Sequence, residues 1–120
     1  SHNKKYSDGE QLRDFVYIKD VVKVIGWFIK NEKVSGLFNL GSGKARSFND
    51  LAKNVFKYLN KEKKVFYINT PKEIREKYQY YTQAEISKLR KVGYSESFFS
   101  LESGIRDYIV NHLNKKDKYN

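Results

Sequence analysis

The 120-residue sequence contains no cysteine and only two histidines. Without cysteine, the chain can form neither a disulfide framework nor a Cys-ligated metal site. His2 lies in Ser1-His2-Asn3, and we interpret residues 1–5 as a tag remnant or disordered start. His112 is expected to be an ordinary surface histidine on a C-terminal helix. We therefore predict no metal site, and we find no Ser/His/Asp or Cys/His set that would indicate a hydrolase.

Long apolar runs are also absent. No stretch approaches the roughly 18 residues that a membrane-spanning helix needs, and the mean hydropathy is −0.78. No signal peptide is visible at the N-terminus, so we expect a cytoplasmic protein with no membrane partner. The length suits one domain, which we place at residues 6–114.

Acidic residues are few relative to basic ones. Lys and Arg number 24 against 14 acidic residues, which gives a net charge of +10. The lysines are spread singly along the chain, and the densest cluster is Lys115-Lys116-Asp117-Lys118, within a predicted flexible basic tail at 115–120. We interpret the charge as solubilising and expect no nucleic-acid partner. A basic nucleic-acid-binding module remains an alternative.

The order of apolar runs and helix caps predicts an α/β fold with three short strands and four or five helices. The predicted strands are 15–18, 37–40 and 65–68. Helices are predicted after Asp20 and Ser47, at Thr70-Pro71-Lys72-Glu73, between a Thr82/Glu85 capping box and Gly93, and over 101–113.

The predicted helix at 21–30 is apolar almost all round. Such a helix must be packed between other elements or leave one face that needs a partner. A strand that leads into it fits the end of a larger sheet better than the opening of a self-contained fold. A free-standing oligomerisation domain that uses residues 21–29 is a further alternative.

Catalytic and cofactor motifs are incomplete in this sequence. Gly41-Ser42-Gly43-Lys44 lacks the spacing and the hydroxyl of a P-loop, and Arg46 stands where the dinucleotide fingerprint needs a third glycine. We therefore interpret it as a tight turn. Tyr58-Leu59-Asn60-Lys61 is one position short of a Tyr-x-x-x-Lys pair. The residues thus predict binding groups without a catalytic set.

Arg13 and the Tyr78 region are the candidate binding groups. Arg13 precedes the predicted strand at 15–18, so its guanidinium can project from a rigid edge, and arginine suits bidentate phosphate recognition. An ion pair with Asp14 or another acid is the alternative. Tyr78, Tyr80 and Tyr81 lie in a polar stretch before a predicted helix, where they can contact a ligand or pack in the core.

Three groups of residues resemble the C-terminal half of extended short-chain dehydrogenase/reductase enzymes that act on nucleotide sugars. They are the run from Arg13 to Val21, the turn Phe38-Asn39-Leu40-Gly41-Ser42-Gly43 with Ser47, and the closing residues 101–105. Two longer runs, residues 11–17 and 78–84, are similar to the ADP-L-glycero-D-manno-heptose 6-epimerase family. Residues 6–10 depart from the family's substrate-binding loop.

This resemblance implies a fold and a function. It implies the C-terminal fragment of an extended Rossmann-type enzyme, in which Arg13 and Tyr78 bind an ADP-sugar substrate. The parent isomerase would invert C6 of ADP-D-glycero-D-manno-heptose with NADP, for the inner core of lipopolysaccharide, and would assemble as a homo-oligomer. The NADP-binding turn and the catalytic Tyr-x-x-x-Lys would lie in the N-terminal half, so we expect no cofactor and no activity in this fragment. Another nucleotide-sugar epimerase or dehydratase is the close alternative.

Overall fold

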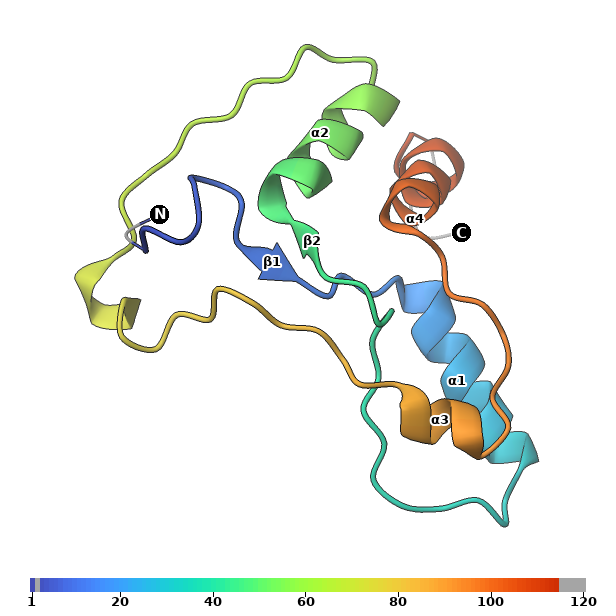
Figure 1. Ribbon diagram of the computed structural model, residues 1–120. Coiled ribbons are helices and arrows are strands. Elements are labelled where there is room, and N and C mark those ends of the chain that lie inside the picture. The colour runs from blue at the N-terminus through green and yellow to red at the C-terminus, as the bar shows by residue number, and fades with distance from the viewer. Residues whose placement is uncertain (2, 115–120) are drawn as a thin grey trace.

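The computed structural model describes residues 1 and 3–114, so the predicted basic tail and His2 lie outside the described residues. The described chain is flat and open, with extents of 48 × 41 × 22 Å. In Figure 1, α2 and α4 lie side by side at one end, and α1 and α3 lie together at the other. Strands β1 and β2 lie between these two groups.

Helix α1, Ile18–Lys30, begins earlier than the sequence predicts. Its N-cap residue is Tyr17, so the prediction that Asp20 caps the helix is wrong. Asp20 instead lies in the first turn, where its buried carboxylate accepts a hydrogen bond of 2.9 Å from the Phe99 backbone N–H. Ile18 is helical, and residues 15–17 have no regular structure. The predicted strand at 15–18 is therefore wrong.

The two strands are shorter than predicted and lie elsewhere. β1, Leu12–Arg13, pairs antiparallel with β2, Arg46–Ser47, so that Leu12 lies opposite Ser47. Leu12 also bridges to Tyr81 in parallel. The predicted strands at 37–40 and 65–68 are wrong, because both runs are irregular. Residues that favour strands promote an extended backbone, but a strand forms only where another segment supplies its hydrogen bonds.

Helices α2 and α4 lie close to where the sequence predicts them. The Ser47 side chain accepts a hydrogen bond of 3.0 Å from the Asp50 N–H at the start of α2, Phe48–Tyr58. The Ser100 hydroxyl likewise accepts a hydrogen bond of 3.1 Å from the Ser103 N–H at the start of α4, Leu101–Tyr108. This helix continues as a π-helical turn over Ile109–Leu113. The two helices pack against each other. The predicted N-cap at Ser47 and the helix at 101–113 are confirmed.

Two other predicted helix starts lead only to short helical segments, and neither has the predicted side-chain cap. The run from Thr70 forms only a 3-10 turn at Lys72–Ile74, without a side-chain cap. Helix α3, Ser87–Lys91, has Ile86 as its N-cap residue, so the predicted Thr82/Glu85 capping box is wrong. The Thr82 hydroxyl instead accepts a hydrogen bond of 3.4 Å from the Asp14 N–H. After α3, Gly93 has φ +112°, which confirms it as the stop.

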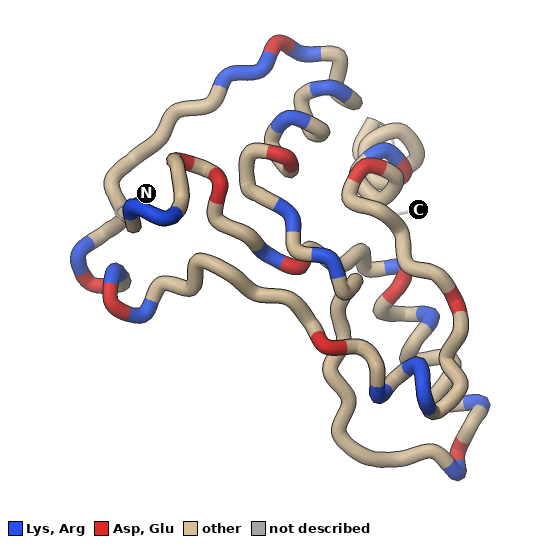
Figure 2. The backbone as a smooth tube through the Cα atoms, in the orientation of Figure 1, with Lys and Arg blue, Asp and Glu red and all other residues tan. Residues whose placement is uncertain are grey.

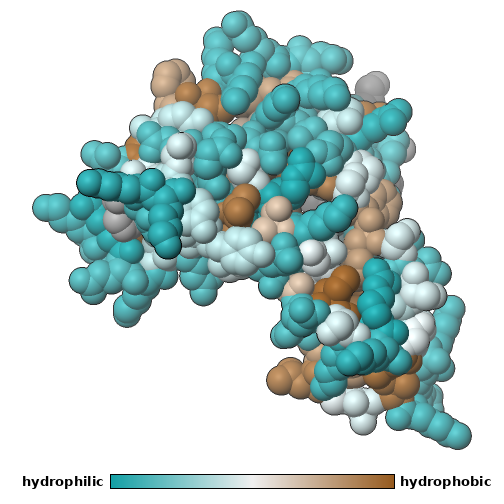
Figure 3. Space-filling model, in the orientation of Figure 1, coloured by the Kyte–Doolittle hydropathy of each residue, from teal (hydrophilic) through white to brown (hydrophobic). Residues whose placement is uncertain are grey.

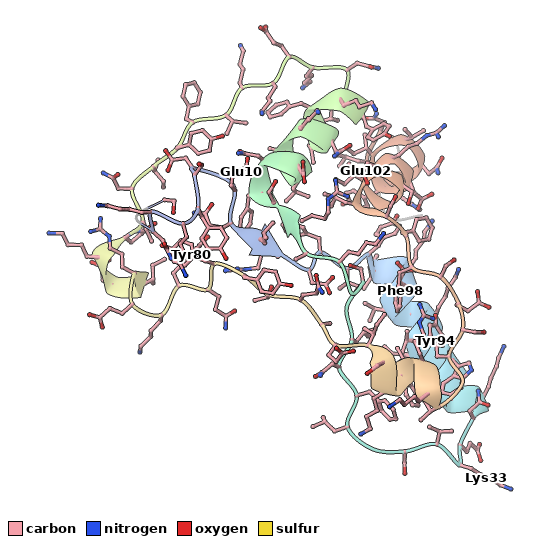
Figure 4. The ribbon with its side chains drawn as sticks, viewed as in Figure 1. Glu10, Lys33, Tyr80, Tyr94, Phe98 and Glu102 are labelled. Atoms are coloured by element: carbon pink, nitrogen blue, oxygen red, sulfur yellow. The ribbon has the colours of Figure 1, made fainter. Side chains whose placement is uncertain are left out.

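The core lies where α1 meets α3 and the segment that follows it. Val24, Leu89 and Tyr94 are buried there. Partly buried aromatic and aliphatic residues surround them, namely Trp27, Phe28, Phe38, Leu40 and Phe98. Figure 4 shows Tyr94 and Phe98 on the segment that runs alongside α1 and α3. This aromatic cluster fixes α1 relative to α3. Within residues 1 and 3–114, two short strands beside four α-helices confirm the predicted α/β class.

Candidate functional site

The structure brings Arg13 and Tyr78 together, although they lie far apart in the sequence. The Cζ atom of Arg13 is 5.4 Å from the centre of the Tyr78 ring and 5.8 Å from that of Phe48. Both distances fall within the range of cation–π attraction. Strand β1 positions Arg13, and the Ser47 cap places Phe48 in the first turn of α2. The two side chains predicted to bind the same ligand are therefore neighbours.

The Arg13 guanidinium carries a charge that no carboxylate neutralises. Among residues 1 and 3–114, it forms no ion pair, and its Nη1 donates a 3.1 Å hydrogen bond to the Leu12 carbonyl oxygen. The alternative of an ion pair with Asp14 is wrong, because hydrogen bonds from other segments occupy the Asp14 carboxylate. A guanidinium that stacks on aromatic rings and lacks an acidic partner is suited to bind an anion in two hydrogen bonds.

The Asp14 carboxylate joins three segments. Its Oδ1 accepts hydrogen bonds from the N–H and the hydroxyl of Ser42, at 2.8 and 2.6 Å. Its Oδ2 accepts hydrogen bonds from the N–H groups of Gly43 and Ala84, at 2.9 and 3.0 Å. Burial acts to raise the pKa of Asp14, but these hydrogen bonds to the charged form outweigh it, so the pKa is lowered. Asp14 therefore fixes the backbone next to Arg13.

The turn at 41–43 is built around this carboxylate. A Cβ atom on Gly41 would lie 2.6 Å from the Ala84 Cβ and 2.6 Å from the Asp14 Oδ2, so only glycine fits there. Gly43 has φ +79°, in the region that favours glycine. The N–H groups of Ser42 and Gly43 point at Asp14, so this turn does not fit a dinucleotide phosphate. Residues 41–43 bend around Asp14, so the prediction of a glycine-dependent turn holds, but the turn joins an irregular segment to β2 and not a strand to a helix.

A groove of about 680 Å³ is lined by Phe48 and Tyr78, the two rings that Arg13 contacts, together with one side of α2 and residues 65–71. Tyr78 contacts Tyr80 with ring centres 5.0 Å apart, and Tyr80 stacks on Tyr6 at 5.6 Å. Figure 4 shows Tyr80 near the N-terminal segment. Tyr78, which contacts Arg13, is therefore packed against Tyr80 and through it against Tyr6. The site therefore combines a positive charge, aromatic faces and an adjacent hollow.

Sequence reasoning missed three residues of this arrangement. Phe48 was predicted only as the start of a helix, Tyr6 lies in a loop, and Asp14 was considered only as a partner for Arg13. No local pattern marks these roles, because each depends on contacts across more than 25 residues of sequence. Tyr81, also considered as a contact residue, is 52% exposed.

In the described part of the chain, the basic side chains are spread out and do not gather into one patch. Figure 2 shows Lys and Arg scattered over α1, α2, the loop after α2 and the segment near 72–77. The described residues contain no group of three side chains that could hold a metal ion. No helix in this part of the chain is long and apolar enough to cross a membrane.

Comparison with known proteins gives consistent matches. Residues 2–41 match the NAD dependent epimerase/dehydratase family. The chain is 44% identical over 99% of its length to an ADP-L-glycero-D-manno-heptose-6-epimerase of Fusobacterium nucleatum, of which it covers 38%. A protein of the same name from Nitratidesulfovibrio vulgaris is 43% identical over 95% of the chain, which covers 35% of it. The chain thus spans little more than a third of these relatives.

Solved structures agree with these matches. The crystal structure of the Helicobacter pylori ADP-L-glycero-D-manno-heptose-6-epimerase is 36% identical, with a TM-score of 0.65 over 86% of this chain and 30% of that one. A UDP-N-acetylglucosamine 4-epimerase from Methanobrevibacter ruminantium is 26% identical, with a TM-score of 0.69 over 85% of this chain and 31% of that one. The resemblance and the fold predicted from the sequence are confirmed.

Proposed function

We propose that this chain, which is similar over nearly its whole length to ADP-L-glycero-D-manno-heptose 6-epimerases, forms the substrate-binding part of a longer enzyme of that kind. The parent enzyme would invert C6 of ADP-D-glycero-D-manno-heptose for the inner core of lipopolysaccharide. NADP would supply transient oxidation and reduction at that carbon. We place its glycine-rich binding turn elsewhere in the parent, because the dinucleotide fingerprint is incomplete at residues 41–46.

One observation carries the proposal: the guanidinium of Arg13 has no acidic partner in the described chain and lies against Tyr78, a ring that lines a groove. The planar guanidinium can donate two parallel hydrogen bonds to the diphosphate of a nucleotide sugar. The Tyr78 ring holds the guanidinium in place, and its hydroxyl can contact the nucleotide-sugar. These residues bind and orient the substrate, and they take no part in hydride transfer.

The first test removes the charge at Arg13 in the full-length enzyme. We expect Arg13→Ala to weaken binding of an ADP-sugar about tenfold to a hundredfold, since a hydrogen bond to a charged group contributes about 1.5–3 kcal/mol. Isothermal titration calorimetry with ADP-glucose measures this change. Arg106→Ala is the matched control, because Arg106 is an exposed arginine on α4. Equal affinity of Arg13→Ala and Arg106→Ala would disprove the assigned role.

The second test concerns the nucleotide. We expect the full-length enzyme to bind ADP-glucose more tightly than UDP-glucose in the same titration. Equal binding of the two would contradict specificity for ADP and favour another nucleotide-sugar epimerase or dehydratase. Loss of both on Arg13→Ala would still support Arg13 as the phosphate contact, because the diphosphate is common to both ligands.

A further inference from the structure

Phe48 and Arg13 lie on neighbouring elements, and the ring of Phe48 faces the guanidinium. The Arg13 Cζ atom is 5.8 Å from the centre of this ring. Arg13 is half-buried, and Figure 3 shows mainly hydrophilic residues on the visible face around β1 and α2. In such surroundings an arginine side chain samples many conformations, and holding one of them costs entropy. A ring face that attracts the guanidinium reduces the number of conformations that Arg13 samples.

The Phe48 ring is itself fixed by contacts with the chain around β1. The Phe48 N–H donates a hydrogen bond of 3.3 Å to the carbonyl oxygen of Gln11, the residue before β1. Pairing of Leu12 with Ser47 holds the backbone on both sides of this bond. The Phe15 ring meets the Phe48 ring edge to face, with centres 5.5 Å apart and an angle of 81° between the planes. Phe48 is therefore supported, through its backbone and its ring, by residues on either side of β1.

A ring positions an arginine side chain without neutralising its charge. A guanidinium has five N–H donors and no acceptor. A carboxylate partner would neutralise the charge and occupy donors, whereas a ring face attracts the cation through its quadrupole. Arg13 forms no ion pair with residues 1 and 3–114, and the rings of Phe48 and Tyr78 face its guanidinium. The aromatic contacts therefore keep the guanidinium both oriented and charged.

We propose that Phe48 is a positioning residue for substrate binding, which holds the Arg13 guanidinium in the orientation that donates to the diphosphate of the substrate. This inference rests on the proposed function, in which Arg13 binds that diphosphate. A side chain that is fixed before binding loses less conformational freedom when the ligand arrives, so affinity rises. Phe48 therefore raises the affinity through Arg13 and needs no contact of its own with the ligand.

A double-mutant cycle in the full-length enzyme tests this role, with isothermal titration calorimetry against ADP-glucose. Phe48→Leu removes the ring but keeps an apolar side chain. We expect it to weaken binding about threefold to tenfold, which is the size of one cation–π contact. Phe48→Tyr keeps the ring and should retain the affinity of the unaltered enzyme. Tyr108→Leu is the matched control, because it removes an aromatic ring of α4 that is 49% exposed and lies outside the Arg13 site.

The decisive comparison repeats Phe48→Leu in the Arg13→Ala background. If the ring acts through the guanidinium, Phe48→Leu has no further effect on affinity once Arg13 is absent. Losses that add would overturn the proposal, because Phe48 would then contact the ligand or support the fold independently of Arg13. Unchanged affinity of Phe48→Leu alone would overturn it as well. Full affinity of Arg13→Ala is a separate result, which would contradict the proposed function and this inference together.

Steady-state turnover of ADP-D-glycero-D-manno-heptose provides an independent readout. Because Phe48 is assigned to binding of the diphosphate and not to hydride transfer, Phe48→Leu should raise KM by the same factor and leave kcat unchanged. A fall in kcat with unchanged KM would contradict a positioning role in substrate binding. If Phe48→Leu fails to fold, Phe48→Met repeats the cycle, because methionine is flexible enough to fill the same space without a ring.

Discussion

Asp14 and Asp20 lie six residues apart and are used in opposite ways. The Asp14 carboxylate accepts four hydrogen bonds, two on each oxygen. The Asp20 carboxylate is 1% exposed and accepts one hydrogen bond, from the Phe99 N–H, while its Oδ1 has no partner among the described residues. One carboxylate accepts two hydrogen bonds on each oxygen, and the other is buried with one of its two oxygens unpartnered among the described residues.

The comparison shows that the burial of a charged side chain does not by itself indicate how much that side chain contributes to the stability of the fold. Asp14 is only partly buried, yet it connects β1, the turn at 41–43 and residue 84. Asp20 is more deeply buried but connects only α1 to the segment before α4. A buried acceptor without a donor costs free energy, whereas each hydrogen bond to a charged acceptor contributes to stability. We therefore expect the same substitution to have different effects at the two positions.

The largest effect is expected for Asp14→Asn. An amide has one acceptor oxygen, so its NH₂ group must face backbone N–H donors that the carboxylate now accepts. We expect a loss of about 2–3 kcal/mol in the free energy of unfolding, measured by urea denaturation. Glu32→Gln is the control, because it makes the same charge change at an exposed position. A loss no greater than that of Glu32→Gln would show that the hydrogen bonds of Asp14 contribute little.

A smaller effect is expected for Asp20→Ala, which leaves the Phe99 N–H without its acceptor. We expect a loss of about 1–2 kcal/mol in the free energy of unfolding. Asp20→Asn keeps a carbonyl oxygen for this N–H and replaces the unpartnered oxygen, so it should lose less than about 0.5 kcal/mol. The same urea denaturation compares the two variants. If Asp20→Asn is as destabilising as Asp14→Asn, the proposed difference between the two carboxylates is wrong.

The smallest effect concerns Glu102, a partly exposed carboxylate that pairs with an arginine. Arg46 of β2 donates hydrogen bonds of 3.0 and 2.5 Å to Glu102 of α4. The hydrogen bond from Arg46 lowers the pKa of Glu102 from 4.5 to about 2. Figure 4 shows Glu102 on α4, on the side that faces α2. The Glu102 side chain is 40% exposed, so solvent screens this pair. We expect it to contribute only about 0.5 kcal/mol.

The lowered pKa of Glu102 sets the sign of the pH dependence of this ion pair's contribution to stability. The contribution is present above pH 4.5, the ordinary pKa, and is lost as the pH falls towards 2. We expect the difference in unfolding free energy between the unaltered protein and Glu102→Gln to shrink over this range, as measured by urea denaturation from pH 6 to 2.5. A difference that stays constant with pH would show that charge pairing is not its cause.

The success of the sequence predictions depended on whether a feature is local. Ser47 caps α2 through the Asp50 N–H, three residues away, and Gly93 ends α3, so both could be predicted. The strands at 37–40 and 65–68 could not, because strand pairing needs a neighbour that is distant in sequence. Asp20 was mistaken for an N-cap because a cap and a buried first-turn carboxylate look alike in sequence.

The candidate site also combines features that the sequence predicts with features that only tertiary contacts establish. Arg13 and Tyr78 could be proposed from the sequence because each lies in a run that resembles a known family. Their contact, the place of Phe48 beside them and the part played by Asp14 could not be predicted. Each of these depends on segments that meet only in the folded chain.

By itself, the sequence determined the Ser47 cap, the Gly93 stop, the α/β class and the family that the chain resembles, because these depend on residues close together or on recognisable runs. Only the tertiary structure decided that Asp14 is satisfied and that Asp20 is half satisfied. It also decided that Arg13 lacks an acidic partner and that the rings of Phe48 and Tyr78 face its guanidinium. The physical reason is that hydrogen bonding and burial depend on which distant groups come within a few ångströms.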